Sequence, residues 1–217
     1  MPIRPLLRCA LWGLLALAPL AQAATEAMRL RVDATDLERR VLRVQQTLPV
    51  APGPLTLRYA RYLPGGHGPY GDVTRLSGLQ VSAGGQRLAW RRQAGDPFAF
   101  TLVVPDGATA LDLRFEYLAP VRGSGERISV APAMLGIEWE TVLLYVDGPP
   151  VDQQRVRLAL RLPAGWQAAS ALRGADGLPA EPDAQGWRAF GEVSVETLVD
   201  APRSEEHTSE LQSRLHL

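Results

Sequence analysis

One histidine stands out as a residue that could do chemistry. Between Ala24 and Pro202 the only histidine is His67, and it lies in residues 62–71, which read Tyr-Leu-Pro-Gly-Gly-His-Gly-Pro-Tyr-Gly. One interpretation is a rigid crossover between strands, in which His67 and Tyr70 cap the edge of the core. The other is an interaction loop, because prolines restrict the backbone, glycines permit close approach, and aromatic and imidazole groups supply contacts.

The other residue types argue against catalysis by this chain. One histidine, with the sole cysteine at position 9, leaves too few nitrogen or sulfur ligands for a tight zinc site. Neither His-Glu-x-x-His nor Gly-x-Ser-x-Gly occurs, and Gly123-Ser124-Gly125 leads into an expected strand instead of a phosphate-binding helix. We expect no catalytic residue, no metal site and no cofactor in this chain, although a glycosidase-like pair of carboxylates stays open.

The first 23 residues have the features of a secretion signal. Arg4 and Arg8 precede an apolar run from Cys9 to Leu20, and residues 21–23, Ala-Gln-Ala, give the small-x-small cleavage pattern. A membrane anchor is the alternative, but this run is shorter than the roughly 20 residues that a spanning helix needs. We expect cleavage after residue 23, a periplasmic or secreted location, and no membrane association afterwards.

The other end of the chain has an unusual composition. Residues 203–213, Arg-Ser-Glu-Glu-His-Thr-Ser-Glu-Leu-Gln-Ser, resemble the in-frame translation of a sequencing-library adapter. A short native helix is the alternative, since Leu211 and Leu215 lie four residues apart, but nothing before Glu205 continues this period. The expected organisation is a signal peptide at 1–23, one β-rich domain at 24–202, and an artefactual or disordered tail at 203–217. The chain would then be a fragment of a longer parent protein.

Charge is balanced along the chain. It holds 23 basic and 23 acidic residues, and every basic residue is an arginine. A nucleic-acid-binding surface needs a clustered excess of basic side chains, and the sequence has no such cluster. We therefore expect no nucleic-acid partner.

Alternation of apolar and polar residues dominates the expected domain. Leu111, Leu113 and Phe115 alternate with charged residues, and residues 28–33, 98–104 and 156–162 behave in the same way. Such half-buried strands are typical of antiparallel sheets. Gly, Pro and Asp occur between them, where the chain must reverse. The pattern predicts an all-β fold, an antiparallel β-sandwich or a saddle-like curved sheet.

Weaker patterns predict further strands and little helix. The strand candidates are residues 41–47, 55–61, 76–82, 87–92, 127–130, 137–145 and 193–199. Only residues 132–135 suggest a helical turn, and residues 174–185, rich in Gly, Ala, Pro and Asp, predict a surface loop.

Four segments, in order, resemble one family of proteins. They are Leu-Pro-Gly-x-His-Gly-Pro at 63–69, Glu-Trp-Glu-Thr-Val-Leu-Leu-Tyr at 138–145, Leu-Pro-Ala-Gly-Trp at 162–166 and Glu-Thr-Leu-Val-Asp-Ala-Pro at 196–202. Together they resemble the N-terminal domain of the glycyl-aminopeptidase-like zinc metallopeptidases. The resemblance implies a β-rich domain followed by a thermolysin-like helical domain, which carries His-Glu-x-x-His and a downstream glutamate as zinc ligands. Many members have Pro-Gly-Ser-Tyr where this chain has Pro64-Gly65-Gly66-His67.

The resemblance implies a non-catalytic role for this chain. It would help to shape the substrate cleft of an exported metalloaminopeptidase, with the parent's catalytic domain as its partner and a peptide as the substrate by implication. The loop residues that would face the substrate are Pro64, Gly65, Gly66, His67 and Gly68. The alternative is a free-standing periplasmic β-sandwich module that binds carbohydrate or protein through exposed tryptophans, namely Trp90, Trp139, Trp166 or Trp187.

Overall fold

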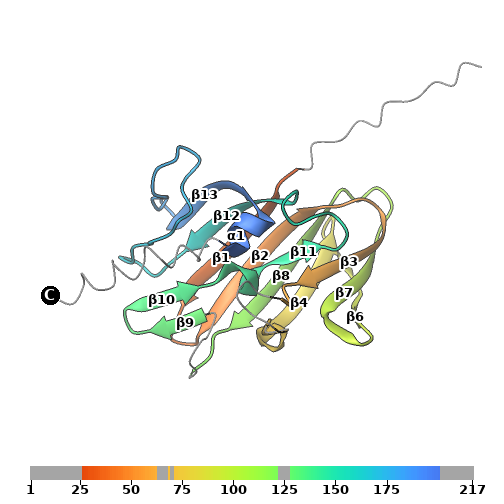
Figure 1. Ribbon diagram of the computed structural model, residues 1–217, viewed down its shortest axis with the longest axis horizontal. Coiled ribbons are helices and arrows are strands. Elements are labelled where there is room, and N and C mark those ends of the chain that lie inside the picture. The colour runs from red at the N-terminus through yellow and green to blue at the C-terminus, as the bar shows by residue number, and fades with distance from the viewer. Residues whose placement is uncertain (1–25, 63–67, 69–70, 122–127, 201–217) are drawn as a thin grey trace, which may run out of the picture.

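The strands form one large sheet, one smaller sheet and a separate hairpin (Figure 1). The computed structural model describes residues 26–62, 68, 71–121 and 128–200. The large sheet contains β1 (Met28–Asp36), β2 (Val41–Pro49), β4 (Leu76–Ala83), β5 (Gln86–Leu88), β8 (Ala110–Leu118), β12 (Arg155–Arg161) and β13 (Trp187–Ser194). The smaller sheet contains β3 (Gly53–Tyr59), β6 (Trp90–Gln93), β7 (Asp96–Val104) and β11 (Leu144–Val146), and the hairpin pairs β9 (Ile128–Ala131) with β10 (Met134–Ile137).

Strand order places β1, β2 and β8 in the middle of the large sheet. Its order is β13-β12-β1-β2-β8-β4-β5, and that of the smaller sheet is β11-β3-β7-β6. Every pair is antiparallel except β1 and β12, which run parallel. In Figure 1 strands β3, β7 and β6 lie at the right and the β9–β10 hairpin lies at the lower left. The predicted all-β, sandwich-like fold is confirmed, with one parallel pair added.

Alternation along the strands produces one shared core. Leu111, Leu113 and Phe115 of β8 are buried, whereas Asp112 and Arg114 on the opposite face are exposed. Apolar side chains of the smaller sheet, among them Leu57, Tyr59 and Phe100, belong to the same buried cluster. Burial of apolar area is the main favourable term in folding, so the two sheets stabilise each other.

One expected strand ends in a helix. Residues 193–199 were expected to be extended, but β13 stops at Ser194 and α1 (Val195–Asp200) follows. The Ser194 hydroxyl accepts a hydrogen bond from the Thr197 N–H at 2.9 Å, which is the geometry of a helix N-cap. Leu198 on this helix is fully buried. The apolar period of the segment therefore belongs to a short capped helix.

Three other expectations are corrected in detail. The expected strand 137–145 is interrupted by the 3-10 helix η2 (Trp139–Val142), whose Thr141 N–H donates to the Glu138 carbonyl at 3.1 Å. The expected strand 87–92 divides into β5 and β6, which belong to different sheets, so the chain crosses from one sheet to the other there. The suggested helical turn at 132–135 is instead the hairpin turn at residues 132–133 followed by the first two residues of β10. None of the helices in the described residues is long and apolar enough to cross a lipid bilayer.

A buried glutamine joins the two sheets. Residues 42, 44, 46 and 48 of β2 face the core, and the third of them is Gln46, which is 2% exposed. Its side-chain oxygen accepts a hydrogen bond from the Leu144 N–H at 3.1 Å, and its amide nitrogen donates to the Leu144 carbonyl at 2.5 Å. The side chain thus bonds the backbone of β11 as a neighbouring strand would.

A second glutamine, Gln154, bonds the backbone of β11 in the same way. Its partner is Val146, two residues after Leu144. The Gln154 side-chain oxygen accepts from the Val146 N–H at 3.0 Å, and its amide nitrogen donates to the Val146 and Pro149 carbonyls, each at 2.9 Å. Between them Tyr145 pairs with Arg58 of β3. The backbone N–H and C=O groups of residues 144 and 146 therefore point away from β3. The side chains of the two glutamines supply the hydrogen bonds that these groups need.

Replacing Gln46 by Leu should destabilise the fold strongly. Both backbone groups of Leu144 would lose their partner inside the protein, and each unsatisfied buried group costs about 1–3 kcal/mol. We expect a loss of about 2–4 kcal/mol in the free energy of unfolding measured by urea titration. The control is Gln45→Leu on the exposed face of the same strand, which should change it by less than about 0.5 kcal/mol. Equal effects at both positions would contradict the role of Gln46.

Candidate functional site

The loop selected from the sequence lies mostly outside the described residues. Pro64, Gly65, Gly66 and His67 fall outside them, and Gly68 is described and half-buried. The two segments that lead into and out of this loop are described in full. The structure therefore defines how the loop is attached, and the substrate-facing role of its residues stays a prediction.

The two ends of the loop meet at its base. The Gly71 N–H donates a hydrogen bond to the Arg61 carbonyl at 3.2 Å. A Cβ atom at position 71 would lie 2.0 Å from the Ala60 carbonyl oxygen, a distance that no side chain tolerates. Only glycine fits this close approach of two backbone segments. The nine residues between Arg61 and Gly71 thus start and finish at one point beside β3.

Buried groups hold this base against the core. Tyr59, the last residue of β3, is 1% exposed, and its hydroxyl donates to the Asp72 carbonyl at 3.5 Å. The Asp72 carboxylate accepts from the Thr74 hydroxyl at 2.5 Å and forms a salt bridge with Arg75, both in the 3-10 helix η1 (Val73–Arg75). Val73 is buried beneath this turn. The exit from the loop is consequently as well anchored as the entrance.

Aromatic rings surround the arginine at the loop entrance. The Arg61 guanidinium lies 5.3 Å from the centre of the Tyr62 ring and 5.7 Å from that of Phe98. Cations within about 6 Å of an aromatic face are attracted by its quadrupole. Tyr62 itself is 67% exposed. The entrance to the loop therefore presents a positive charge and an exposed ring side by side.

An ion-pair network fixes β3 just before the loop. Arg58 bonds Asp96 at 2.5 Å and Asp147 at 3.0 Å, which joins β3 to β7 and to the residue after β11. Burial alone would raise the pKa of the Asp96 carboxyl, but hydrogen bonds from the Phe98 N–H and from Arg58 outweigh burial and lower this pKa. Burial raises the pKa of the neighbouring Tyr145 phenol. Asp96 therefore stays ionised beside Arg58 down to acid pH.

No cluster of metal ligands appears in the part of the chain that the structure describes. Nowhere in residues 26–62, 68, 71–121 and 128–200 do three or more His, Cys, Asp or Glu side chains gather so that they could hold a metal ion. These residues do not fit the zinc site that the resemblance assigns to the parent's catalytic domain.

The tryptophans do not form an exposed platform. Trp139 is 6% exposed and belongs to the core, and the half-buried Trp90 packs edge-on against Phe100 with its ring N–H bonded to the Leu79 carbonyl at 3.1 Å. Trp187, also half-buried, lies under the Arg31 guanidinium at 4.1 Å. Trp166 is half-buried as well. The stacking surface that a carbohydrate-binding module would need is not assembled from these residues.

The two packed sheets define a β-sandwich domain. The sequence profile of the peptidase M61 N-terminal domain matches residues 29–204. The chain belongs to this family, and the resemblance seen in its four segments is confirmed. No curated protein sequence matches the chain.

The solved structures that the chain resembles include much longer proteins. An aminopeptidase N family protein from Idiomarina loihiensis has a TM-score of 0.63 and 15% identity over 80% of this chain and 28% of that chain. Leukotriene A4 hydrolase from Saccharomyces cerevisiae has a TM-score of 0.48 and 9% identity, over 78% and 27% of the two chains. An M1 zinc metallopeptidase from Deinococcus radiodurans has a TM-score of 0.43 and 16% identity, over 78% and 38%. The first of these likenesses supports the fold alone, and the chain spans well under half the length of each protein.

Acid should weaken the fold partly through Arg58. A carboxyl whose folded pKa is lowered stabilises the protein above its unfolded pKa, near 4, and this stabilisation is lost as the pH falls through the folded pKa. Arg58→Gln should therefore lose about 1 kcal/mol of unfolding free energy at pH 7 and very little at pH 2, in urea titrations across this range. The control is Arg91→Gln, which removes an exposed charge from β6 and should leave the pH profile unchanged. A wild-type-like profile for Arg58→Gln would contradict the role of this network.

Proposed function

We propose that this chain is the non-catalytic N-terminal β-domain of an exported, glycyl-aminopeptidase-like zinc metallopeptidase. The observation that carries the proposal is the match of the M61 N-terminal domain profile over residues 29–204. In this proposal the parent protein is a metalloaminopeptidase that is periplasmic or secreted, and its catalytic domain supplies the zinc and cleaves the bond. The present chain binds no metal of its own and is not associated with a membrane after signal cleavage.

The domain's task in this proposal is to shape one wall of the substrate cleft. Its partner is the catalytic domain of the same parent chain, and the peptide substrate lies between them. The loop of residues 62–70 is the proposed contact, because its base is fixed to the core through Arg61, Gly71 and Tyr59. A loop on a rigid base can hold a peptide without losing much entropy on binding. Such a loop would affect substrate positioning and leave the chemistry of bond cleavage to the other domain.

A free-standing binding module is the competing function. It would need exposed aromatic side chains, and the positions of Trp90, Trp139, Trp166 and Trp187 do not favour it. The genomic reading frame separates the two functions, since the proposal expects His-Glu-x-x-His downstream of residue 202 and the binding module expects a stop codon.

Replacing His67 by Ala in the parent protein tests the cleft role. If the loop positions the peptide, kcat/KM for peptide hydrolysis should fall about tenfold, because small misplacement of reacting groups costs rate. The zinc content should stay unchanged. If His67 only completes a turn, the melting temperature should fall by the few degrees that correspond to about 1 kcal/mol, with kcat/KM of the folded enzyme unchanged.

The deciding comparison pairs kinetics with thermal melting on the same protein samples. The control is Ser77→Ala, an exposed residue of β4 beyond the loop base, which should leave kcat/KM unchanged. Unchanged kinetics with a lowered melting temperature for His67→Ala would rule out the proposed contact between this loop and the substrate.

A further inference from the structure

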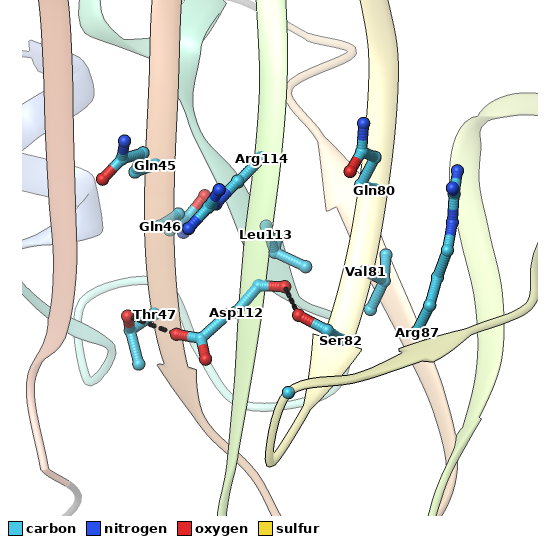
Figure 2. A pocket seen from close by; sticks show the side chains of 11 residues that line it. Gln45, Gln46, Thr47, Gln80, Val81, Ser82, Arg87, Asp112, Leu113 and Arg114 are labelled. Carbon is cyan, nitrogen blue, oxygen red and sulfur yellow. Dashed lines mark hydrogen bonds between the residues drawn. The ribbon is translucent and has the colours of Figure 1, made fainter.

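The outer face of the large sheet carries a hollow that the proposed function does not use. It has a volume of about 470 Å³ and lies over β2, β8, β4 and the turn into β5. Figure 2 shows the side chains that line it, with Gln45 and Thr47 from β2, Asp112 and Arg114 from β8, Gln80 and Ser82 from β4, and Arg87 from β5. Its volume is in the range of small-ligand sites, but its lining is polar.

Strand register explains why these side chains gather. Residues that pair across antiparallel strands point to the same face of the sheet. One row across the sheet is Arg29, Thr47, Asp112, Ser82 and Arg87, and the next row is Arg31, Gln45, Arg114 and Gln80. Both rows therefore face outward, opposite the core.

The four arginines of these rows have no carboxylate partner in the described part of the chain. Arg29, Arg31, Arg87 and Arg114 are exposed, and none of them forms a salt bridge with a described residue. Arginines elsewhere on the same face are paired: Arg157 bonds Glu192 at 3.0 Å and Arg43 bonds Asp36 at 2.7 Å. On this face of the sheet, the four arginines without a carboxylate partner thus lie at the hollow and its border.

The acidic residue in the middle of the hollow already accepts hydrogen bonds from its neighbours. Asp112 is the acidic residue among those that line the hollow, and its carboxylate accepts a hydrogen bond from the Thr47 hydroxyl at 2.8 Å. Its backbone carbonyl accepts from the Ser82 hydroxyl at 3.4 Å, as Figure 2 shows. These hydrogen bonds leave the negative charge of Asp112 in place, but the two lining arginines, Arg87 and Arg114, outnumber it, so the region keeps a net positive charge.

We propose that this hollow binds an acidic peptide segment in extended conformation. Arg114 and Arg87 would each bind a carboxylate, for which the planar guanidinium fork is well suited. Gln45 and Gln80 offer both donors and acceptors, as peptide amides require. A polyphosphate offers only acceptors at neutral pH and would leave the acceptor oxygens of Gln45, Gln80 and Asp112 unpaired, whereas the N–H groups of a peptide can donate to them. The proposal does not depend on the parent protein being a peptidase.

Binding of a labelled hexaglutamate to the full chain tests the proposal. Fluorescence anisotropy in about 20 mM salt should show saturable binding that weakens strongly at 0.5 M salt, because exposed charges are screened. Arg114→Gln and Arg87→Gln should each weaken binding about threefold to fivefold, the usual size for one exposed charge pair. The control Arg91→Gln, which removes a charge from the other sheet, should change binding less than about 1.5-fold, and hexalysine should not bind.

Three results would overturn the proposal. The first is absence of saturable binding to the wild-type chain at millimolar peptide. The second is an equal loss for Arg91→Gln, which would show non-specific attraction. The third is displacement of the peptide by inorganic phosphate at equal ionic strength and similar concentration, which would show a simple anion site. Both lining arginines are exposed, so thermal melting of their variants should match the wild type and keep the comparison valid.

Discussion

The bonds from Gln46 to the backbone of β11 fix the position of the smaller sheet on the large one. The position faces the core, where an apolar side chain is normally the more stable choice. The amide is stable there because both of its polar groups are bonded to Leu144, so that no buried polar group is left unsatisfied. Since the smaller sheet reaches the large one through buried apolar contacts that have no direction, these bonds specify where β11 lies along β2.

Several features near the proposed cleft depend on that placement. Strand β11 is hydrogen-bonded to β3, and β3 ends at Tyr59, where the base of the 62–70 loop begins. Arg58 adds an ionic link between β3, Asp96 and Asp147. Gln154 supports the other end of β11, and its carbonyl accepts from the Val195 N–H at 2.8 Å at the start of α1. The loop base, η2 and α1 are thus connected through one short strand.

Most strands of the large sheet could be predicted from the alternation of apolar and polar residues, because each long strand has one face exposed to solvent. The prediction failed where local hydrogen bonds outweigh apolar spacing: Ser194 caps a helix inside an expected strand, and Thr141 bonds Glu138 inside another. Ser194 as an N-cap residue, with the acidic Glu196 in the turn that follows it, was a readable signal for a helix start. Gln46 was also visible as a polar residue at an inward position, but its partner lies 98 residues away and no local pattern identifies it. The two rows that contain the unpaired arginines likewise arise only from the register of five strands.

The central claim is that this chain serves a catalytic domain without performing catalysis itself. It is tested most directly by deleting residues 24–202 from the parent protein and then adding the present chain in trans, with peptide hydrolysis as the readout. The account predicts that each part alone is inactive, that the parent fragment keeps its zinc, and that activity returns in a saturable way as the chain is added. Hydrolysis by the chain alone, or full activity of the parent without it, would contradict the account.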